Sequence, residues 1–369
     1  MTDRVLAAVA VSDGRTELAE FAFPELVPEA GLLEVEVTGV CGSDWGYYTR
    51  YPTQRGPLIL GHETVGRVAR LGRDAGARWG LKEGDRIALE EYVPCGHCNY
   101  CRSGDFRLCD ATELRPGTLR YGSTPTSVAP ALWGGYSQYQ YLHPNAVFHR
   151  VPEHVPGAQA ALALPLSNGF EWTYLQGRLQ LGETIIVQGP GQQGLACVLA
   201  AREAGAGCII VTGLGNATDA FRMALAKKLG AHHTIDIEAQ DLLETVGDLT
   251  AGRMADLVID CASGGPATVT SAIQLAGKRG RIILGGQKGQ AVPAFPADLL
   301  IANFLTVKGM RGHSYQSVEL ALKAIASGRH PLEAMATHQF RLAETDEALQ
   351  TLVGRGRPNP IHCTVYPWQ

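Results

Sequence analysis

The chain has 369 residues, of which 45% are hydrophobic and 18% are charged, so it is globular and long enough for two domains with separate cores. Its 32 basic and 36 acidic side chains give a formal net charge of −4, with no long run of like charge. This balance excludes the basic surface of a protein that binds nucleic acid or an anionic membrane, and it favours a small neutral or weakly charged partner.

The first residues, from Met1 to Leu6, lack the charged segment and long apolar core of a signal peptide. No apolar run approaches the roughly 18 residues of a transmembrane helix. These features predict a cytoplasmic protein without a membrane partner. Four of the nine cysteines fall within fifteen residues, which in a reducing compartment indicates metal ligands before disulfides.

Short β-branched runs broken by glycine and proline extend to about Arg150, for example at 32–37 and 63–69. They predict an all-β, barrel-like domain. Two motifs in this region offer metal ligands beside glycines, Val40-Cys-Gly-Ser-Asp44 and Gly61-His-Glu-Thr-Val-Gly66. Because a lone cysteine or histidine is more often part of a core than a ligand, either motif alone is weak evidence.

Four cysteines follow in the chain, separated by two, two and seven residues: Cys95, Cys98, Cys101 and Cys109. This spacing predicts a closed tetrahedral site in which four thiolates surround one Zn²⁺ and leave no position for a substrate. Such a site is structural. Since four thiolates complete the metal's ligand set, His97 is predicted to be a surface residue. The spacing differs from that of ferredoxins, so zinc is favoured over an iron–sulfur cluster.

From about Leu181 to Gly286, strand candidates alternate with helix-length segments. The strands are expected at 184–188, 207–212, 255–260 and 280–284, and the helices between them at 195–204 and 220–229. This alternation predicts a doubly wound parallel sheet. After about Thr306 we expect a helix at 317–327 and a last strand at 361–366, which returns to the first domain.

The first of these strands leads into a dinucleotide-binding fingerprint, Gly189-Pro-Gly191-Gln192-Gln193-Gly194. The first glycine permits a tight turn, the second lets the backbone approach a pyrophosphate, and the third allows close packing of the helix on the strand. The helix N-terminus then faces the phosphates. Because strand, turn and helix follow in the required order, we predict a dinucleotide cofactor bound at this turn.

An acidic residue usually ends the second strand of such a fold and binds the ribose of NAD, but here Thr212 and Gly213 occupy that place. Asp219 would reach the ribose, or Arg222 would bind the 2′-phosphate of NADP, or either is only a solvated residue at the start of a helix, so both cofactors stay open. NAD is favoured, because no dense basic cluster follows the strand and a phosphate with a charge of about −2 needs basic partners.

In this order along the chain, the motifs resemble those of the zinc-containing medium-chain dehydrogenases, especially the polyol and threonine dehydrogenase branch. The resemblance covers nearly the whole chain. It implies an α/β protein with a GroES-like β-barrel catalytic domain (1–166 and 307–369) and a Rossmann domain (167–306). It also implies an NAD(P)-dependent alcohol dehydrogenase that acts on a small alcohol or carbonyl compound and forms a homodimer or homotetramer.

By the same resemblance, Cys41 and His62 bind a catalytic zinc ion, and Glu63 is a direct or intermittent third ligand. Ser43 passes the substrate proton outward, while Asp44 orients His62. The resemblance further places Asn168 beside the nicotinamide ring and His362 near a cationic contact to the pyrophosphate. Ordinary polar packing explains these last two residues equally well.

Two positions depart from the family pattern. Relatives in this branch carry glutamate, and classical alcohol dehydrogenases carry cysteine, where this chain has Leu164, which cannot bind zinc. Gly46 stands where many relatives have the histidine that ends the proton relay, so Tyr47, Tyr48 or water would replace it. Cysteine, histidine and glutamate still provide three ligands and leave the fourth place for water or substrate, so we expect the catalytic zinc.

The expected reaction is hydride transfer from a zinc-activated alcohol to the nicotinamide ring. Aromatic residues at 45–48 and 121–136 either wall the substrate pocket, which suits a bulky cyclic alcohol, or pack in the core. The branch resemblance suggests a polyol instead. Two rival functions stay open: a zinc-independent reductase of quinones or activated alkenes, and a non-catalytic protein that binds zinc and nucleotide.

Overall fold

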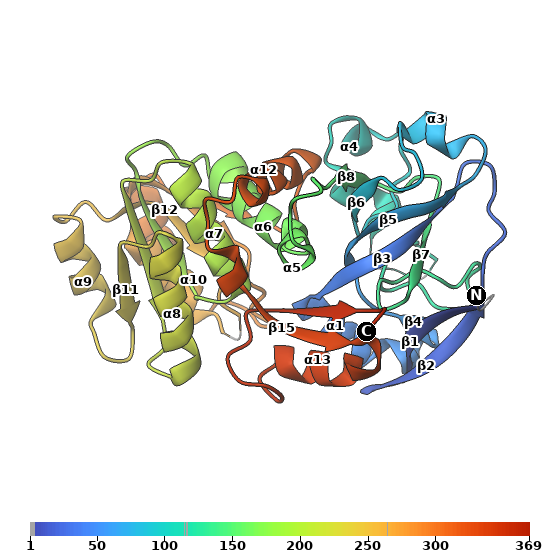
Figure 1. The fold of residues 1–369 in the computed structure, drawn as a ribbon. Helices are drawn as coiled ribbons and strands as arrows, with labels where there is room; N and C mark the ends of the chain where they lie inside the picture. Colours follow the sequence, from blue (N-terminus) through green and yellow to red (C-terminus); the bar gives the residue numbers. More distant parts are fainter. Residues whose placement is uncertain (1–3, 114, 116, 264) are drawn as a thin grey trace. The chain divides into compact units, whose positions relative to one another are not determined.

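The computed structural model describes residues 4–113, 115, 117–263 and 265–369. They form two compact units (Figure 1). The first unit combines the described residues up to Leu164 with Ser314–Gly328 and Leu332–Gln369, and the second consists of Pro165–His313 and Arg329–Pro331. Among the described residues, no helix combines the length and the apolar character that crossing a bilayer requires.

The first unit is built on a largely antiparallel sheet. Its strands follow the order β15 (Ala336–Arg341), β16 (His362–Tyr366), β3 (Gly31–Val40), β5 (Glu63–Leu71), β6 (Arg86–Leu89) and β8 (Phe148–Arg150), and β7 (Tyr139–Leu142) also pairs with β3. A smaller sheet contains β2 (Arg15–Ala22), β1 (Arg4–Ser12) and β4 (Leu58–Ile59). Because β16 pairs with β3, the C-terminal strands, red in Figure 1, join the blue N-terminal ones.

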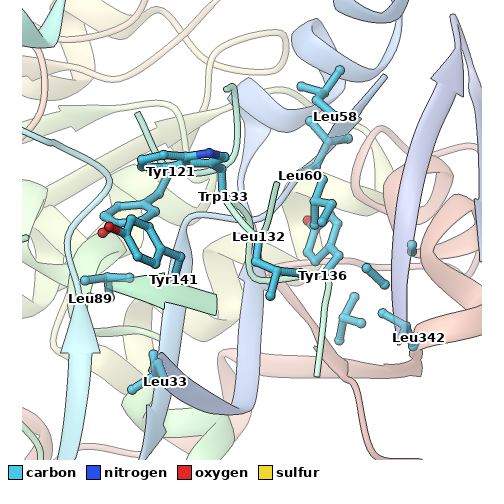
Figure 2. Close-up of a cluster of buried hydrophobic side chains, with 14 of the residues drawn as sticks. Leu33, Leu58, Leu60, Leu89, Tyr121, Leu132, Trp133, Tyr136, Tyr141 and Leu342 are labelled. Atoms are coloured by element: carbon cyan, nitrogen blue, oxygen red, sulfur yellow. The ribbon is translucent and has the colours of Figure 1, made fainter. Parts of the chain in front are cut away.

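Short helices connect and cover these strands: α1 (Gly42–Tyr48), α2 (Tyr51–Arg55), α3 (Ala75–Trp79), α4 (Asn99–Arg102), α5 (Gly157–Ala160), α12 (Tyr315–Ala326) and α13 (Thr345–Leu352). A hydrophobic core fills the unit (Figure 2). Tyr121, Trp133 and Tyr136 belong to it, and none of them is more than 2% exposed. The aromatic residues of segment 121–136 therefore pack in the core, which was one of the two roles the sequence left open.

The second unit contains a six-stranded sheet in the order β11 (His233–Asp236), β10 (Cys208–Gly213), β9 (Thr184–Gln188), β12 (Ala255–Asp260), β13 (Ala276–Leu284) and β14 (Thr306–Gly309). Every neighbouring pair is parallel. Its central strands are continuous apolar runs such as Ile185–Val187, which is typical of strands buried on both faces. The strand order reverses between β9 and β12, and sheets of this kind bind nucleotides at that point.

The second unit contains the helices α7 (Gln192–Glu203), α8 (Ala217–Leu229), α9 (Leu242–Leu249), α10 (Ala267–Leu275) and α11 (Ala297–Ala302), and α6 (Ala163–Phe170) spans its boundary with the first unit. A π-helical turn, Glu171–Gln176, follows α6. Helix α8 shows why these segments fold as they do. Asn216 accepts a hydrogen bond from the N–H of Asp219 at its N-terminus, and Gly230 follows its last residue, so both ends carry a preferred capping residue.

Candidate metal sites and active site

The four clustered cysteines converge in the loop that follows β6. Their Sγ atoms all lie within 4.8 Å of one another. The Sγ atoms of Cys98 and Cys101 are 3.5 Å apart, and those of Cys95 and Cys101 are 3.9 Å apart. Four thiolates bound to one Zn²⁺ at about 2.3 Å have sulfur–sulfur separations of about 3.8 Å, so the residues fit the closed zinc site that the spacing predicts.

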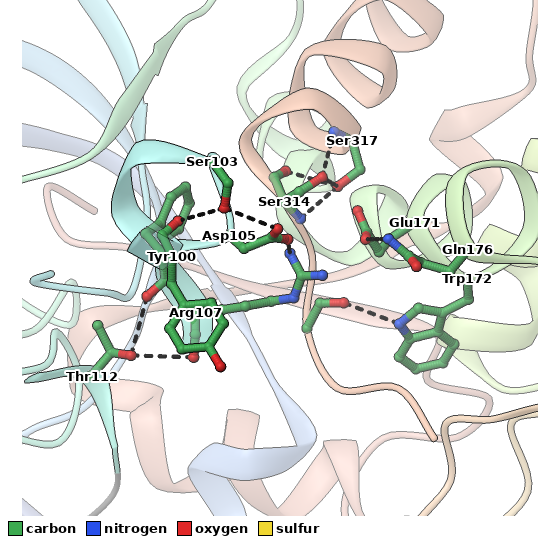
Figure 3. Close-up of polar contacts among 12 residues, drawn as sticks. Tyr100, Ser103, Asp105, Arg107, Thr112, Glu171, Trp172, Gln176, Ser314 and Ser317 are labelled. Atoms are coloured by element: carbon green, nitrogen blue, oxygen red, sulfur yellow. Dashed lines mark hydrogen bonds and ion pairs between the residues drawn. The ribbon is translucent and has the colours of Figure 1, made fainter. Parts of the chain in front are cut away.

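Hydrogen bonds within the cysteine loop favour the thiolate form that binds a metal cation. Backbone N–H groups of His97 and Cys98 lower the pKa of Cys95 to about 6, which favours its thiolate. His97 itself is exposed, as expected. The Thr112 hydroxyl donates to the Cys109 carbonyl at 2.7 Å. Arg107 forms an ion pair with Asp105 at 3.2 Å (Figure 3). The loop is therefore held by its own backbone and side chains around the four thiols.

A second set of metal donors comes from three residues at element boundaries. Cys41 is the residue before α1, and Glu63 is the first residue of β5, directly after His62. One donor atom from each of the three lies within 4.8 Å of the other two. Thiolate, imidazole and carboxylate bind zinc at about 2.0–2.3 Å, so one ion fits among them. Unlike the cysteine cluster, this triad leaves a fourth tetrahedral position open.

His62 is oriented from behind by a buried carboxylate. Its Nδ1 lies 3.1 Å from Oδ1 of Asp44, which has no exposed surface. The other oxygen of Asp44 accepts hydrogen bonds from the Cys41 N–H at 3.0 Å and from the Tyr136 hydroxyl at 2.9 Å. Burial alone lowers the pKa of His62, but Asp44 outweighs it and raises this pKa well above the usual value. Nε2 is thus the nitrogen that faces the metal donors, and Ser43 Oγ lies 3.3 Å from it.

Glu63 has a partner that the sequence did not reveal. Its Oε2 lies 3.1 Å from Nε2 of His362 on β16, and both side chains are buried. The resemblance placed His362 near the pyrophosphate, whereas the structure places it without exposed surface against Glu63. A Cβ atom on Gly39 of β3 would stand 2.4 Å from Glu63 Oε2 and 2.5 Å from His362 Nε2. Only glycine at this position leaves room for the pair.

Tyr47 and Tyr48, the two predicted replacements for the relay histidine, lie in different surroundings. The Tyr48 hydroxyl donates to the Gly14 carbonyl at 2.5 Å and lies 2.9 Å from Asp346 Oδ1, so it is occupied in the core. The ring of Tyr47 lies 6.5 Å from that of His62, and its hydroxyl has a pKa raised to about 12 by burial and by Glu91. Tyr47 is therefore the tyrosine that borders the triad.

An acid–arginine pair beside the triad was also missed by the sequence analysis. Oε2 of Glu91 lies 4.0 Å from Nε2 of His62 and accepts a hydrogen bond from Arg120 Nη2 at 2.5 Å. Burial tends to raise the pKa of Glu91, but Arg120 and His62 lower it to about 2, so the carboxylate is ionised at neutral pH. No motif marks either residue, and only the fold brings them together.

The fingerprint forms the expected turn between β9 and α7. Gly189 has φ +93°, a left-handed conformation that favours glycine. A Cβ atom on Gly194 would stand 2.0 Å from the Gly189 carbonyl oxygen, so the third glycine is sterically required. Buried Nε2 of Gln192 and Oε1 of Gln193 have no hydrogen-bond partner among the described residues. Unpaired polar atoms at a helix N-terminus fit a site that a dinucleotide completes.

Carboxylates gather around the loop that follows β10. Asp219 accepts a hydrogen bond from the N–H of Leu214 at 2.9 Å, and Glu238 accepts one from the N–H of Gly215 at 2.8 Å. Asp236, at the end of β11, would contact a side chain placed on Gly215. Arg222 lies 3.8 Å from Asp219. Thr212 and Gly213 end β10, as predicted, and both are buried. The sequence did not indicate that Asp236 and Glu238 lie near this strand end.

Asn168, the residue assigned by resemblance to the nicotinamide, already has a partner within the second unit. Its Oδ1 lies 3.1 Å from Nδ1 of His313. The structure also buries Leu164, which supplies no metal donor. The triad therefore depends on Cys41, His62 and Glu63 for its protein ligands.

Comparison with known proteins assigns the family. Residues 28–153 match the alcohol dehydrogenase GroES-like domain, and residues 194–327 match the zinc-binding dehydrogenase family. A probable alcohol dehydrogenase of Mycobacterium tuberculosis is 35% identical over 98% of this chain and 98% of its own length. The chain belongs to the zinc-dependent medium-chain dehydrogenase superfamily. A sorbitol dehydrogenase of Bacillus subtilis is 30% identical over 93% of this chain and 92% of its own length.

An alcohol dehydrogenase of known structure from Thermotoga maritima is 26% identical and has a TM-score of 0.85, covering 99% of both chains. The predicted combination of a GroES-like domain and a Rossmann domain is confirmed. As a member of the medium-chain dehydrogenases, the protein is an NAD(P)-dependent oxidoreductase of small-molecule alcohols, with zinc and a nicotinamide dinucleotide as cofactors. The expected enzyme class and cofactors are confirmed too.

Proposed function

We propose that this dehydrogenase oxidises a polyol or a cyclic alcohol, or reduces the corresponding carbonyl compound, at the triad of Cys41, His62 and Glu63. The observation that carries the proposal is the contrast between two donor sets. Four cysteines would complete the tetrahedral ligand set of one zinc ion, whereas the three donors of the triad would leave one position for the substrate oxygen. In this proposal the first unit is the catalytic domain and the second binds the cofactor through Gly189, Gly191, Gln192, Gln193 and Gly194, with Thr212, Gly213 and Asn168 at its edges.

Each residue of the triad region has a distinct task. A zinc ion held by the triad would lower the pKa of the substrate hydroxyl, and a bound nicotinamide would take up the hydride. Asp44 holds His62 so that Nε2 faces the ion. Ser43 is exposed and lies beside Nε2, so its hydroxyl takes the proton of the substrate and passes it to solvent. Tyr47 provides an apolar wall with a hydroxyl that stays protonated.

We expect alcohol-dependent reduction of the nicotinamide, with kcat/KM at least about tenfold higher for NAD than for NADP, because a 2′-phosphate would meet the carboxylates of Asp219, Asp236 and Glu238. Steady-state kinetics with both cofactors and a panel of polyols and cyclic alcohols measures this. Arg222→Ala is the control and keeps the preference for NAD. A preference for NADP that this variant erases would make Arg222 the residue that selects the cofactor.

We also propose a cytoplasmic homodimer or homotetramer. In the described part of the chain β14 is an edge strand that pairs only with β13, and edge strands offer unpaired backbone groups to a second copy. Nearby, α11 has no buried residue, and Ile301 and Phe304 are 72% and 77% exposed. Phe304→Glu is expected to shift the protein to monomers in sedimentation velocity, while Leu181→Glu, which replaces another exposed apolar residue, leaves the oligomer intact. A wild-type monomer would contradict this proposal.

A further inference from the structure

A carboxylate lies beside the triad, on the Nε2 side of His62. Glu91 follows β6, and its side chain is 15% exposed, so it is neither fully buried nor free in solvent. Its Oε2 approaches Nε2 of His62 to 4.0 Å, on the side opposite to the nitrogen held by Asp44. A hydroxyl group that reacts at the triad would lie beside Nε2. The substituent on the neighbouring carbon would then come within reach of the Glu91 carboxylate.

Arg120 fixes the position and the charge of this carboxylate. The guanidinium is buried, donates to Glu91 Oε2 at 2.5 Å and to the Thr112 carbonyl at 3.2 Å, and lies over the ring of Tyr92 at 4.8 Å. The contacts with Thr112 and Tyr92 hold the arginine in place, and its hydrogen bond keeps Glu91 beside His62. It also neutralises the negative charge, so the pair has little attraction for a cationic substrate such as an amino alcohol.

An acceptor of this kind discriminates between alcohols. A cyclic apolar substrate would cover the carboxylate and offer its oxygens no hydrogen-bond donor, which is unfavourable. A second hydroxyl group on the substrate would supply that donor directly. Hydrogen bonds to charged groups are stronger than those between neutral groups, and sites built around them reject analogues that lack the donor.

Building on the proposed dehydrogenase function, we infer that Glu91, positioned by Arg120, determines specificity by accepting a hydrogen bond from a second hydroxyl group adjacent to the one that reacts. The substrate class is then a vicinal diol or polyol, and not a cyclic apolar alcohol. Glu91 takes no part in hydride or proton transfer. It acts on the choice of substrate.

The test compares vicinal butanediol with sec-butanol, which share a carbon skeleton and a secondary hydroxyl group. In the zinc-loaded wild type we expect kcat/KM to favour the diol. Glu91→Leu is expected to reduce kcat/KM for the diol by about 10- to 100-fold relative to sec-butanol, mainly through KM. Glu91→Gln keeps the shape and one acceptor and should give an intermediate ratio. Calorimetric titration of both alcohols should show the same loss of diol binding without any turnover.

Glu36→Gln is the matched control, because it too removes a carboxylate from an arginine, Arg86, within the first unit. It should leave the ratio of the two alcohols unchanged. If Glu91→Leu does not fold, Glu91→Gln decides alone. An equal effect on both alcohols, or an unchanged ratio, overturns the assignment of Glu91. Absence of turnover with either alcohol in the wild type would instead contradict the proposed function.

Discussion

Replacing Cys41 by alanine is expected to remove one of two zinc ions per chain and to lower kcat/KM for alcohol oxidation by about a thousandfold or more. A Lewis acid at the substrate oxygen contributes several kcal/mol of transition-state stabilisation, and each factor of ten corresponds to about 1.4 kcal/mol. Cys41 supplies the thiolate of the triad, to which the described residues add no fourth donor within 4.8 Å of all three, so its loss leaves His62 and Glu63 for the ion. Elemental analysis and steady-state kinetics on the same preparation measure both effects.

Two further variants separate the zinc sites. Cys208→Ala removes a cysteine that belongs to neither cluster and should keep two ions and full activity. Cys101→Ala opens the four-thiolate site, so it should lose the ion that resists chelators and lower the melting temperature, because a closed zinc site contributes directly to folding. One ion in the wild type, together with undiminished activity in Cys41→Ala, would refute the catalytic zinc and favour a zinc-independent reductase.

Features encoded over a short stretch of sequence were predictable. The four cysteines lie within fifteen residues, and their spacing alone indicated the set of thiols that the fold brings within 4.8 Å. The fingerprint was equally local. A side chain at its third glycine, Gly194, would clash with the carbonyl oxygen of its first, Gly189. Strands such as Thr184–Gln188 and Ala255–Asp260 fall where their apolar runs predicted, because burial on both faces leaves a continuous apolar signal.

Pairs that depend on the fold were not predictable from one sequence. Glu63 and His362 are 299 positions apart and meet only because β16 pairs with β3 in the same sheet as β5. Glu91 and Arg120 are 29 positions apart with no motif around either. Asp236 reaches the loop after β10 because β11 lies beside β10. In each case the residue type gave no signal, since glutamates, aspartates and arginines are common on any surface.

The Glu63–His362 pair leads to a second prediction with a large effect. Glu63→Gln keeps the shape of the side chain but removes its negative charge, and we expect the affinity of the triad for zinc to fall by about 10- to 100-fold, with a comparable loss of kcat/KM. The four-cysteine ion and the melting temperature should change little, because that cluster is untouched. Titration with a competing chelator, followed by metal analysis, reports the affinity independently of turnover.

His362→Gln distinguishes a ligand from its support. If Glu63 contacts the metal and His362 only holds it, then His362→Gln should weaken zinc binding in the same direction but less than Glu63→Gln does, because the carboxylate stays in place. Glu20→Gln, an exposed glutamate paired with Arg4, should have no effect on either quantity. Full zinc and full turnover in Glu63→Gln would show that Glu63 is neither a ligand nor a necessary support. In that case Glu91, which lies on the Nε2 side of His62, is the other carboxylate that could bind the ion. Loss of zinc in Glu91→Gln would then identify Glu91 as a metal ligand and not as the residue that selects the substrate.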